Sequence, residues 1–293
     1  MNLFKRLNSK RSSKSTEALS STSMTVDSPP AYSPAPRSGT TTTTTIPAQI
    51  PPEDSPYSFL AQFDTVFLVD DSGSMVGRSW RETCTALRAI APICTAYDQD
   101  GIDIYFLNHR NPHSRGGNDL GGYANVTTAA AVDEIFRSVR PAGGTPTGTR
   151  LNQILKPYLA ELKAHLDRQG ARPDAVGGPK PLNIIVITDG VPTDDVESVI
   201  VSAAKRLDAY DAEPWQVGIQ FFQVGDEPQA AADLRDLDDA LSAQHGIRDM
   251  VDTVPWSGGK GGGRGQPQAL TAEECLKVTM GAVNRRLDRR QCP

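Results

Sequence analysis

Apolar and polar positions follow two different periods along residues 57–293 and predict strands and helices in turn. Short, mainly apolar runs are typical of strands that are buried on both faces, and we expect such strands at residues 65–70, 102–107, 182–188, 217–224 and 250–254. Apolar residues spaced three and four apart predict helices, which we expect at residues 78–97, 129–139, 151–166, 194–207, 228–241 and 271–290. Strands that alternate with helices form a parallel sheet with helices on both faces. With a short antiparallel edge strand at residues 123–126, the sequence predicts an α/β fold with a doubly wound, mostly parallel six-stranded sheet.

Residues 1–56 differ in composition from the rest of the chain. Serine, threonine and proline dominate this segment, and residues 40–45 are all threonine. It has too few apolar residues to offset the conformational entropy that ordering would cost. We therefore predict a disordered tail over residues 1–56, followed by one domain over residues 57–293 with its core at about residues 60–255.

The tail contains a P-P-x-Y motif formed by Pro29, Pro30 and Tyr32. Extended proline-rich segments dock in the aromatic grooves of WW-type domains, so a WW-domain protein is one expected partner. Such tetrapeptides also arise by chance in proline-rich tails. The first sixteen residues carry five basic and no acidic residues. Three interpretations of them are open: a solvated basic tail, a patch that binds a membrane surface, or a mitochondrial presequence.

Composition and charge argue against several classes of function. The net charge of −5 and the pI near 5.4 argue against nucleic-acid binding, which requires a basic face. The apolar runs are far shorter than the ~20 residues of a transmembrane helix, and no secretory signal pattern opens the sequence. The four cysteines show neither C-x-x-C pairs nor the spacing of a zinc site. They are expected to be reduced, as in a cytoplasmic protein.

A group of oxygen-bearing side chains follows the first predicted strand. Asp70, Ser72 and Ser74 occupy alternate positions directly after the apolar run Val66–Val69. Open α/β sheets bind their ligands at the carboxyl ends of the strands. A carboxylate and two hydroxyls are hard oxygen ligands, which suit Mg²⁺ or Mn²⁺ better than zinc. The pattern therefore predicts a divalent-cation site at this edge of the sheet.

This D-x-S-x-S pattern resembles the metal-ion-dependent adhesion site of von Willebrand factor A domains. Two further segments are similar to motifs of that family. They are the loop at residues 143–149, which contains Thr145 in a Gly-Gly-Thr sequence, and the strand end at residues 187–190, which contains Asp189. The resemblance implies the Rossmann-like A-domain fold and a cation held by five side chains: Asp70, Ser72, Ser74, Thr145 and Asp189.

The resemblance also implies a function. In this family a metal with few protein carboxylates stays electrophilic and accepts a carboxylate from the partner. We therefore expect a stand-alone intracellular module, not an enzyme, that binds an acidic residue of a protein partner through Mg²⁺ or Mn²⁺. A role as an adaptor in ubiquitin-linked or signalling assemblies follows from the P-P-x-Y motif. Copines and plant ubiquitin ligases of the A-domain type are similar proteins, but four scattered cysteines cannot build the RING of those ligases.

One residue departs from the family pattern. Asp71 stands where many members of the family carry glycine. Its side chain either faces away from the metal or turns inward, and an inward carboxylate would strengthen metal binding and weaken the capture of an acidic partner. Both orientations are open from the sequence.

A Mg²⁺-dependent phosphotransferase or phosphatase is the alternative function. Haloacid-dehalogenase-type enzymes need aspartate at the first and third positions of the motif, and Ser72 occupies the third position here. The chain contains neither a G-x-x-x-x-G-K-[ST] phosphate loop nor a G-x-S-x-G elbow. His109 and His113 lie four residues apart, but Pro112 places them in a loop, which favours surface residues over a metal-binding pair.

Overall fold

The structure, a computed structural model, describes residues 58–97, 100–114, 120–171, 177–225 and 241–256, with a few scattered residues between positions 229 and 279. The predicted disordered tail, with Pro29, Pro30 and Tyr32, lies outside the described residues. The predicted helices at residues 228–241 and 271–290 lie largely outside them as well.

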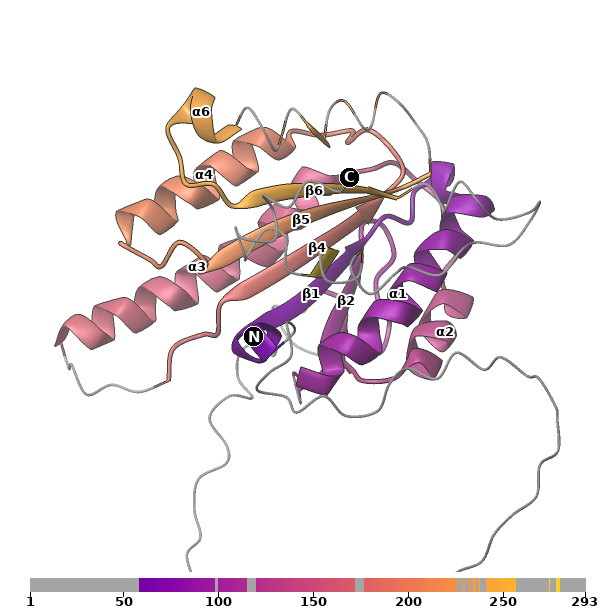
Figure 1. The fold of residues 1–293 in the computed structure, drawn as a ribbon, viewed down its shortest axis with the longest axis horizontal. Helices are drawn as coiled ribbons and strands as arrows, with labels where there is room; N and C mark the ends of the chain where they lie inside the picture. The colour runs from indigo at the N-terminus through magenta and orange to yellow at the C-terminus, as the bar shows by residue number, and fades with distance from the viewer. Residues whose placement is uncertain are drawn as a thin grey trace, which may run out of the picture.

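The centre of the fold is a six-stranded sheet with the strand order β3-β2-β1-β4-β5-β6 (Figure 1). The strands are β1 (Asp64–Val69), β2 (Ile102–Phe106), β3 (Tyr123–Val126), β4 (Leu182–Thr188), β5 (Val217–Val224) and β6 (Val251–Trp256). Neighbouring strands pair in parallel, except that β3 pairs antiparallel with β2. The predicted doubly wound, mostly parallel sheet with one antiparallel edge strand is confirmed.

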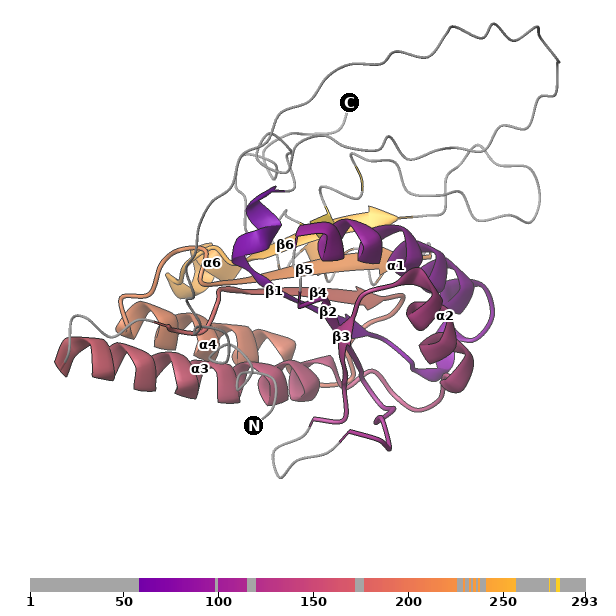
Figure 2. The same cartoon turned by 90° about the horizontal axis from the view of Figure 1, so that it is seen from below.

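Helices cover both faces of this sheet. They are α1 (Arg78–Tyr97), α2 (Ala129–Ser138), α3 (Thr147–Ala171), α4 (Val196–Ala209) and α6 (Leu241–His245), with short 3₁₀ helices at Ser58–Gln62 and Gly73–Met75. Figure 2 shows α1 and α2 on one face and α3 and α4 on the other. In the part of the chain that the structure describes, no helix is both long and apolar enough to span a bilayer.

The side chains of β1 alternate between two hydrophobic cores. Phe67 and Val69 pack in the core that includes α1 and α2, whereas Val66 and Leu68 pack in the core that includes α3 and α4. Successive residues of a strand point to opposite faces, so a strand with helices on both sides is buried, and mainly apolar, on both faces. All residues of β4 and β5 are buried for the same reason.

Asp194 caps a different helix from the one that the sequence predicts. We expected it to begin the helix after β4, but α4 begins after Asp195, whose carboxylate accepts a hydrogen bond from Ser198 N at 2.9 Å. The Asp194 carboxylate instead accepts hydrogen bonds from Gly148 N at 2.8 Å and Thr149 N at 2.6 Å, in the first turn of α3. These N–H groups have no intrahelical partner, and a negative charge is favourable at a helix N-terminus. The loop after β4 is thereby anchored to the start of α3.

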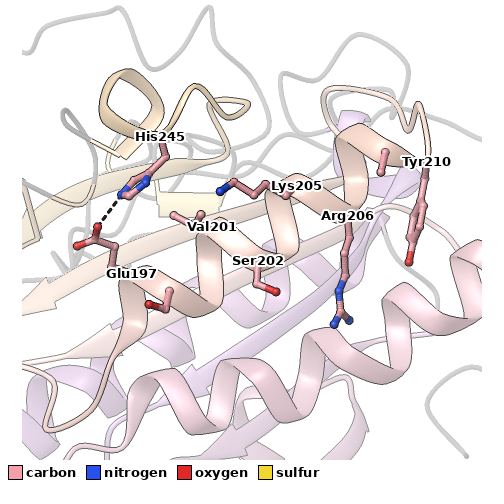
Figure 3. A pocket seen from close by; sticks show the side chains of 9 residues that line it. Glu197, Val201, Ser202, Lys205, Arg206, Tyr210 and His245 are labelled. Carbon is pink, nitrogen blue, oxygen red and sulfur yellow. Dashed lines mark hydrogen bonds and ion pairs between the residues drawn. The ribbon is translucent and has the colours of Figure 1, made fainter.

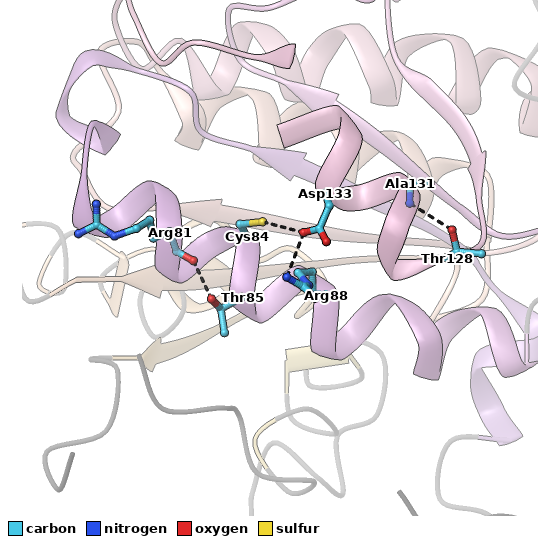
Figure 4. Close-up of polar contacts among 7 residues, drawn as sticks. All are labelled: Arg81, Cys84, Thr85, Arg88, Thr128, Ala131 and Asp133. Atoms are coloured by element: carbon cyan, nitrogen blue, oxygen red, sulfur yellow. Dashed lines mark hydrogen bonds and ion pairs between the residues drawn. The ribbon is translucent and has the colours of Figure 1, made fainter. Parts of the chain in front are cut away.

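The helices α1 and α2 share a polar contact at Cys84 (Figure 4). The Cys84 thiol donates to Asp133 Oδ1 at 3.7 Å, and the same carboxylate oxygen pairs with Arg88 at 3.2 Å. Burial, together with the negative charge of Asp133, raises the pKa of Cys84 to about 11. The thiol is therefore protonated at neutral pH. Cys84 and Cys94, the cysteines that the structure describes, form no disulfide.

Candidate metal centre

The carboxyl ends of β1 and β4 meet at one edge of the sheet. The two strands are neighbours, with Val69 opposite Ile187, and Asp70 N donates a hydrogen bond to Ile187 O at 2.8 Å. From β1 the strand order runs to β2 on one side and to β4 on the other. Open α/β sheets bind ligands at such a switch point. The topology thus places the loops that follow Asp70 and Ile187 side by side at this point.

Asp70 is fully buried, and both of its carboxylate oxygens accept hydrogen bonds. Oδ1 accepts from Ser72 N at 2.8 Å, and Oδ2 accepts from the Thr188 hydroxyl at 2.7 Å. Burial raises the pKa of Asp70; the hydrogen bonds from Thr188 and Ser72 oppose the rise, and the nearby charge of Asp189 adds to it. A bound cation would favour the ionised form of both carboxylates.

A chain of hydroxyl contacts joins the first motif to Asp189. The Oγ atoms of Ser72 and Ser74 lie 2.9 Å apart, within hydrogen-bond distance. The Ser74 hydroxyl donates to Asp189 Oδ1, also at 2.9 Å. Ser72 is buried, whereas Ser74 is exposed. Oxygen atoms from two distant parts of the sequence therefore gather at a place that solvent reaches.

Backbone hydrogen bonds hold the loop of Thr145 against both other motifs. Gly73 N donates to Gly143 O at 3.1 Å, which joins this loop to the loop after β1. Thr193 N donates to Thr145 O at 2.9 Å, which joins it to the loop after β4. The Thr145 side chain is buried at 6% exposure. The structure thus brings the loop of Thr145 beside the other predicted ligands through its backbone.

Asp71 faces away from this group and binds the end of β2. Its Oδ1 accepts hydrogen bonds from Asn108 N at 2.7 Å and Asn108 Nδ2 at 3.1 Å, and its Oδ2 accepts one from His109 N at 2.8 Å. Of the two orientations that the sequence leaves open, the structure shows the one directed away from Asp70. The contacts of Asn108 and of Thr188 at the site were not predicted. Asn108 follows β2 and Thr188 ends β4. A position at the end of a strand is the only sequence signal that could have indicated these two residues.

The donor set fits a small, hard cation. It contains the carboxylates of Asp70 and Asp189 and three hydroxyls, from Ser72, Ser74 and Thr145. Carboxylate and neutral oxygens in this proportion are typical of Mg²⁺ and Mn²⁺ sites. Within the described residues, no three histidine, cysteine, aspartate or glutamate side chains are grouped so that they could hold a metal. A site that uses hydroxyl oxygens is therefore the candidate that this part of the chain offers.

His109 belongs to an aromatic cluster instead of a metal-binding pair. Its Nε2 lies 2.9 Å from the Tyr123 hydroxyl, its ring stacks on that of Tyr123, and it meets Phe106 edge-on. Burial lowers the pKa of His109, so the ring is neutral at pH 7. His113 is exposed, as predicted, whereas His109 is partly covered by this cluster.

A separate groove of about 460 Å³ follows α4 and reaches α6 (Figure 3). Lys205, Arg206 and Tyr210 line it, and at one end His245 Nε2 lies 2.7 Å from Glu197 Oε1. None of the five predicted metal ligands lines this groove. It is therefore distinct from the candidate metal centre.

Comparison with known families agrees with this architecture. A family model described as the von Willebrand factor type A domain matches residues 64–250, from the first residue of β1 to the residue before β6. No curated protein matches the chain. The domain is generally a protein-interaction module, and its members commonly bind a divalent metal. Because the match covers more than half of its 293 residues, this chain belongs to the von Willebrand factor type A domain family.

Proposed function

We propose that this chain is a protein-binding module that works through a divalent cation, Mg²⁺ or Mn²⁺. The ligands are the five side chains named above: Asp70, Ser72, Ser74, Thr145 and Asp189. The observation that carries the proposal is the hydroxyl chain from Ser72 through Ser74 to Asp189, beside the buried carboxylate of Asp70. A hydroxyl keeps acceptor lone pairs while it donates, so these groups can turn toward a cation. A cation there would also offset the repulsion between the two carboxylates.

The proposed ligands differ in exposure, and this difference supports separate roles. Asp70 is buried and held by donors on both oxygens, so its orientation does not depend on a cation. Ser74 is exposed, so the site is open to solvent on that side. When bound, a cation with only two protein carboxylates stays electrophilic and can accept a carboxylate oxygen from a partner.

Two exposed apolar side chains lie close in sequence to the proposed ligands. Val76 is 64% exposed and Val191 is 41% exposed. Val76 follows Ser74 by two residues, and Val191 follows Asp189 by two residues. Because the centres of protein interfaces are apolar and poor in charge, these side chains support a protein partner that presents its acidic residue beside apolar groups.

The proposal includes a second contact through the tail. The motif of Pro29, Pro30 and Tyr32 fits the grooves of WW domains, and such a contact would make the chain an adaptor in a ubiquitin-linked or signalling assembly. A peptide of residues 26–36 should bind an isolated WW domain, and Tyr32→Ala should abolish that binding. Unchanged binding after Tyr32→Ala would remove this part of the proposal.

The proposal is that the site binds and does not catalyse. In haloacid-dehalogenase-type enzymes the third position of the motif is an aspartate that acts as general acid, and Ser72 occupies that position here. Assays with generic phosphate esters test the alternative directly. Mg²⁺-dependent turnover that Asp70→Ala abolishes would support an enzyme instead.

Affinity capture with and without a chelator tests the proposed function. The full chain, Asp70→Ala and the control Asp167→Ala would each serve as bait, in Mg²⁺ and in EDTA. Asp167 is a matched control because it lies on α3 at 65% side-chain exposure and, among the described residues, pairs with the exposed Lys163. We expect the wild type and Asp167→Ala to capture the same partners in Mg²⁺. These partners should be lost when EDTA is present or when Asp70→Ala is the bait. A partner set indifferent to both treatments would overturn the proposal.

A further inference from the structure

Asp71 is a buried carboxylate beside the candidate metal centre that is not one of the proposed ligands. The residue is 1% exposed, and its carboxylate accepts three hydrogen bonds from Asn108 and His109 at the end of β2. A buried carboxylate costs free energy unless hydrogen bonds satisfy it. These donors therefore stabilise Asp71 where it lies, and the carboxylate in turn fixes the position of Asn108.

The side chain of Asn108 bridges Asp71 and the loop that carries Thr145. Its Nδ2 donates to Asp71 Oδ1 at 3.1 Å and to Gly144 O at 2.9 Å. Both partners can only accept hydrogen bonds, so the amide must present its NH₂ group to them. Gly144 directly precedes Thr145. The bridge therefore ends one peptide unit from a proposed ligand.

Gly143 makes room for this bridge. Its φ is +95°, which favours glycine, and a Cβ at this position would lie 2.8 Å from Asn108 Oδ1, so a side chain here would displace the Asn108 amide. The carbonyl oxygen of Asp71 accepts a hydrogen bond from Ala142 N at 2.7 Å. Residues 142–144 are thus all in contact with Asp71 or Asn108.

We infer that Asp71 and Asn108 are positioning residues for metal binding. They hold residues 142–144 in place so that Thr145 can take part in the ligand set; this inference rests on the proposed function. Groups that orient metal ligands commonly change metal affinity by tenfold or more when they are removed. If the bridge acts in this way, its loss weakens metal binding mainly through Thr145.

Calorimetric titration of Mn²⁺ into the full, metal-stripped chain tests the inference with a mutant cycle. The proteins are the wild type, Asn108→Ala, Thr145→Ala and the double variant. We expect Asn108→Ala to weaken Mn²⁺ binding about tenfold. In the Thr145→Ala background it should change the affinity by less than about twofold, because no hydroxyl remains to be positioned. A loss by the same factor in both backgrounds would mean general damage to the site and would overturn the inference.

Two further variants sharpen the test. Asn111→Ala is a matched control, since Asn111 lies in the same loop but donates to Gly122 O, and it should bind Mn²⁺ like the wild type. Asp71→Asn keeps the size of the side chain but places an NH₂ group against a backbone donor, so we expect a partial loss. This variant also serves if Asn108→Ala does not fold.

The wild-type titration separates the two levels of the proposal. A wild-type chain that does not bind Mn²⁺ overturns the proposed function, and the inference with it. Wild-type binding that both Asn108→Ala and Asp71→Asn leave unchanged overturns the inference alone.

Discussion

The Thr188 hydroxyl, at the end of β4, donates a 2.7 Å hydrogen bond to Oδ2 of Asp70, at the end of β1. The same hydroxyl accepts a hydrogen bond from Gly190 N at 3.2 Å. It therefore links the buried carboxylate to the loop that carries Asp189. Hydrogen bonds to a charged acceptor are stronger than neutral ones. Asp70 is thus held in one orientation by the protein itself.

Removal of this hydroxyl should destabilise the chain. Thr188→Val keeps the shape of the side chain but leaves Asp70 Oδ2 without this donor. We expect the free energy of unfolding to fall by about 2 kcal/mol in EDTA, measured by chemical denaturation. Thr85→Val is the control, because within the described residues the Thr85 hydroxyl donates to Arg81 O of the same helix, and it should cost less than about 0.5 kcal/mol. Equal unfolding free energies for Thr188→Val and the wild type would contradict this role.

The cap that Asp194 provides to α3 should contribute more than the cap that Asp195 provides to α4. Asp194 accepts two hydrogen bonds, from Gly148 N and Thr149 N, and joins two segments of the chain, whereas Asp195 accepts one within its own helix. Asp194→Ala should lower the free energy of unfolding by about 2 kcal/mol, and Asp195→Ala should lower it by less. Amide hydrogen exchange should also speed up at Gly148 and Thr149 in Asp194→Ala. Unchanged exchange there would show that the cap does not hold this turn.

The Cys84 thiol should react slowly until the pH is high. Burial, followed by the charge of Asp133, raises its pKa from 9.0 to about 11, and the thiolate is the reactive form. The rate of iodoacetamide alkylation at Cys84, followed by peptide mass spectrometry, should therefore still rise between pH 9 and 10. Asp133→Asn removes a charge that raises the pKa of Cys84 and should speed the reaction at pH 8. Arg88→Ala removes a charge that lowers this pKa and should slow the reaction. A rate that levels off below pH 9 would contradict this environment.

The architecture of the sheet could be predicted because it follows from local patterns. The apolar run Val66–Val69 has no polar break, and a strand between two layers of helices needs none. Helical spacing between such runs requires parallel crossovers, and these bring the carboxyl ends of β1 and β4 to one edge. The proximity of Asp70 to Asp189 follows from that topology.

The contacts that organise the site could not be predicted, because they join segments that are distant in sequence. Asp194 was expected to cap the adjacent helix, but it binds Gly148, 46 residues away. Asn108 reaches Gly144, 36 residues away, and nothing near Asn108 in the sequence indicates that partner. Several loops lie within reach of a polar side chain at a strand end, and only the tertiary structure decides among them.

Direct metal binding is the central claim, and equilibrium titration of Mg²⁺ or Mn²⁺ into the metal-stripped chain tests it most directly. We predict one bound cation per chain for the wild type and for the surface control Asp167→Ala. Asp70→Ala and Asp189→Ala should each abolish this binding, because each removes one of the two proposed carboxylate ligands. No binding by the wild type, or binding that Asp70→Ala and Asp189→Ala leave intact, would contradict the assignment of this site.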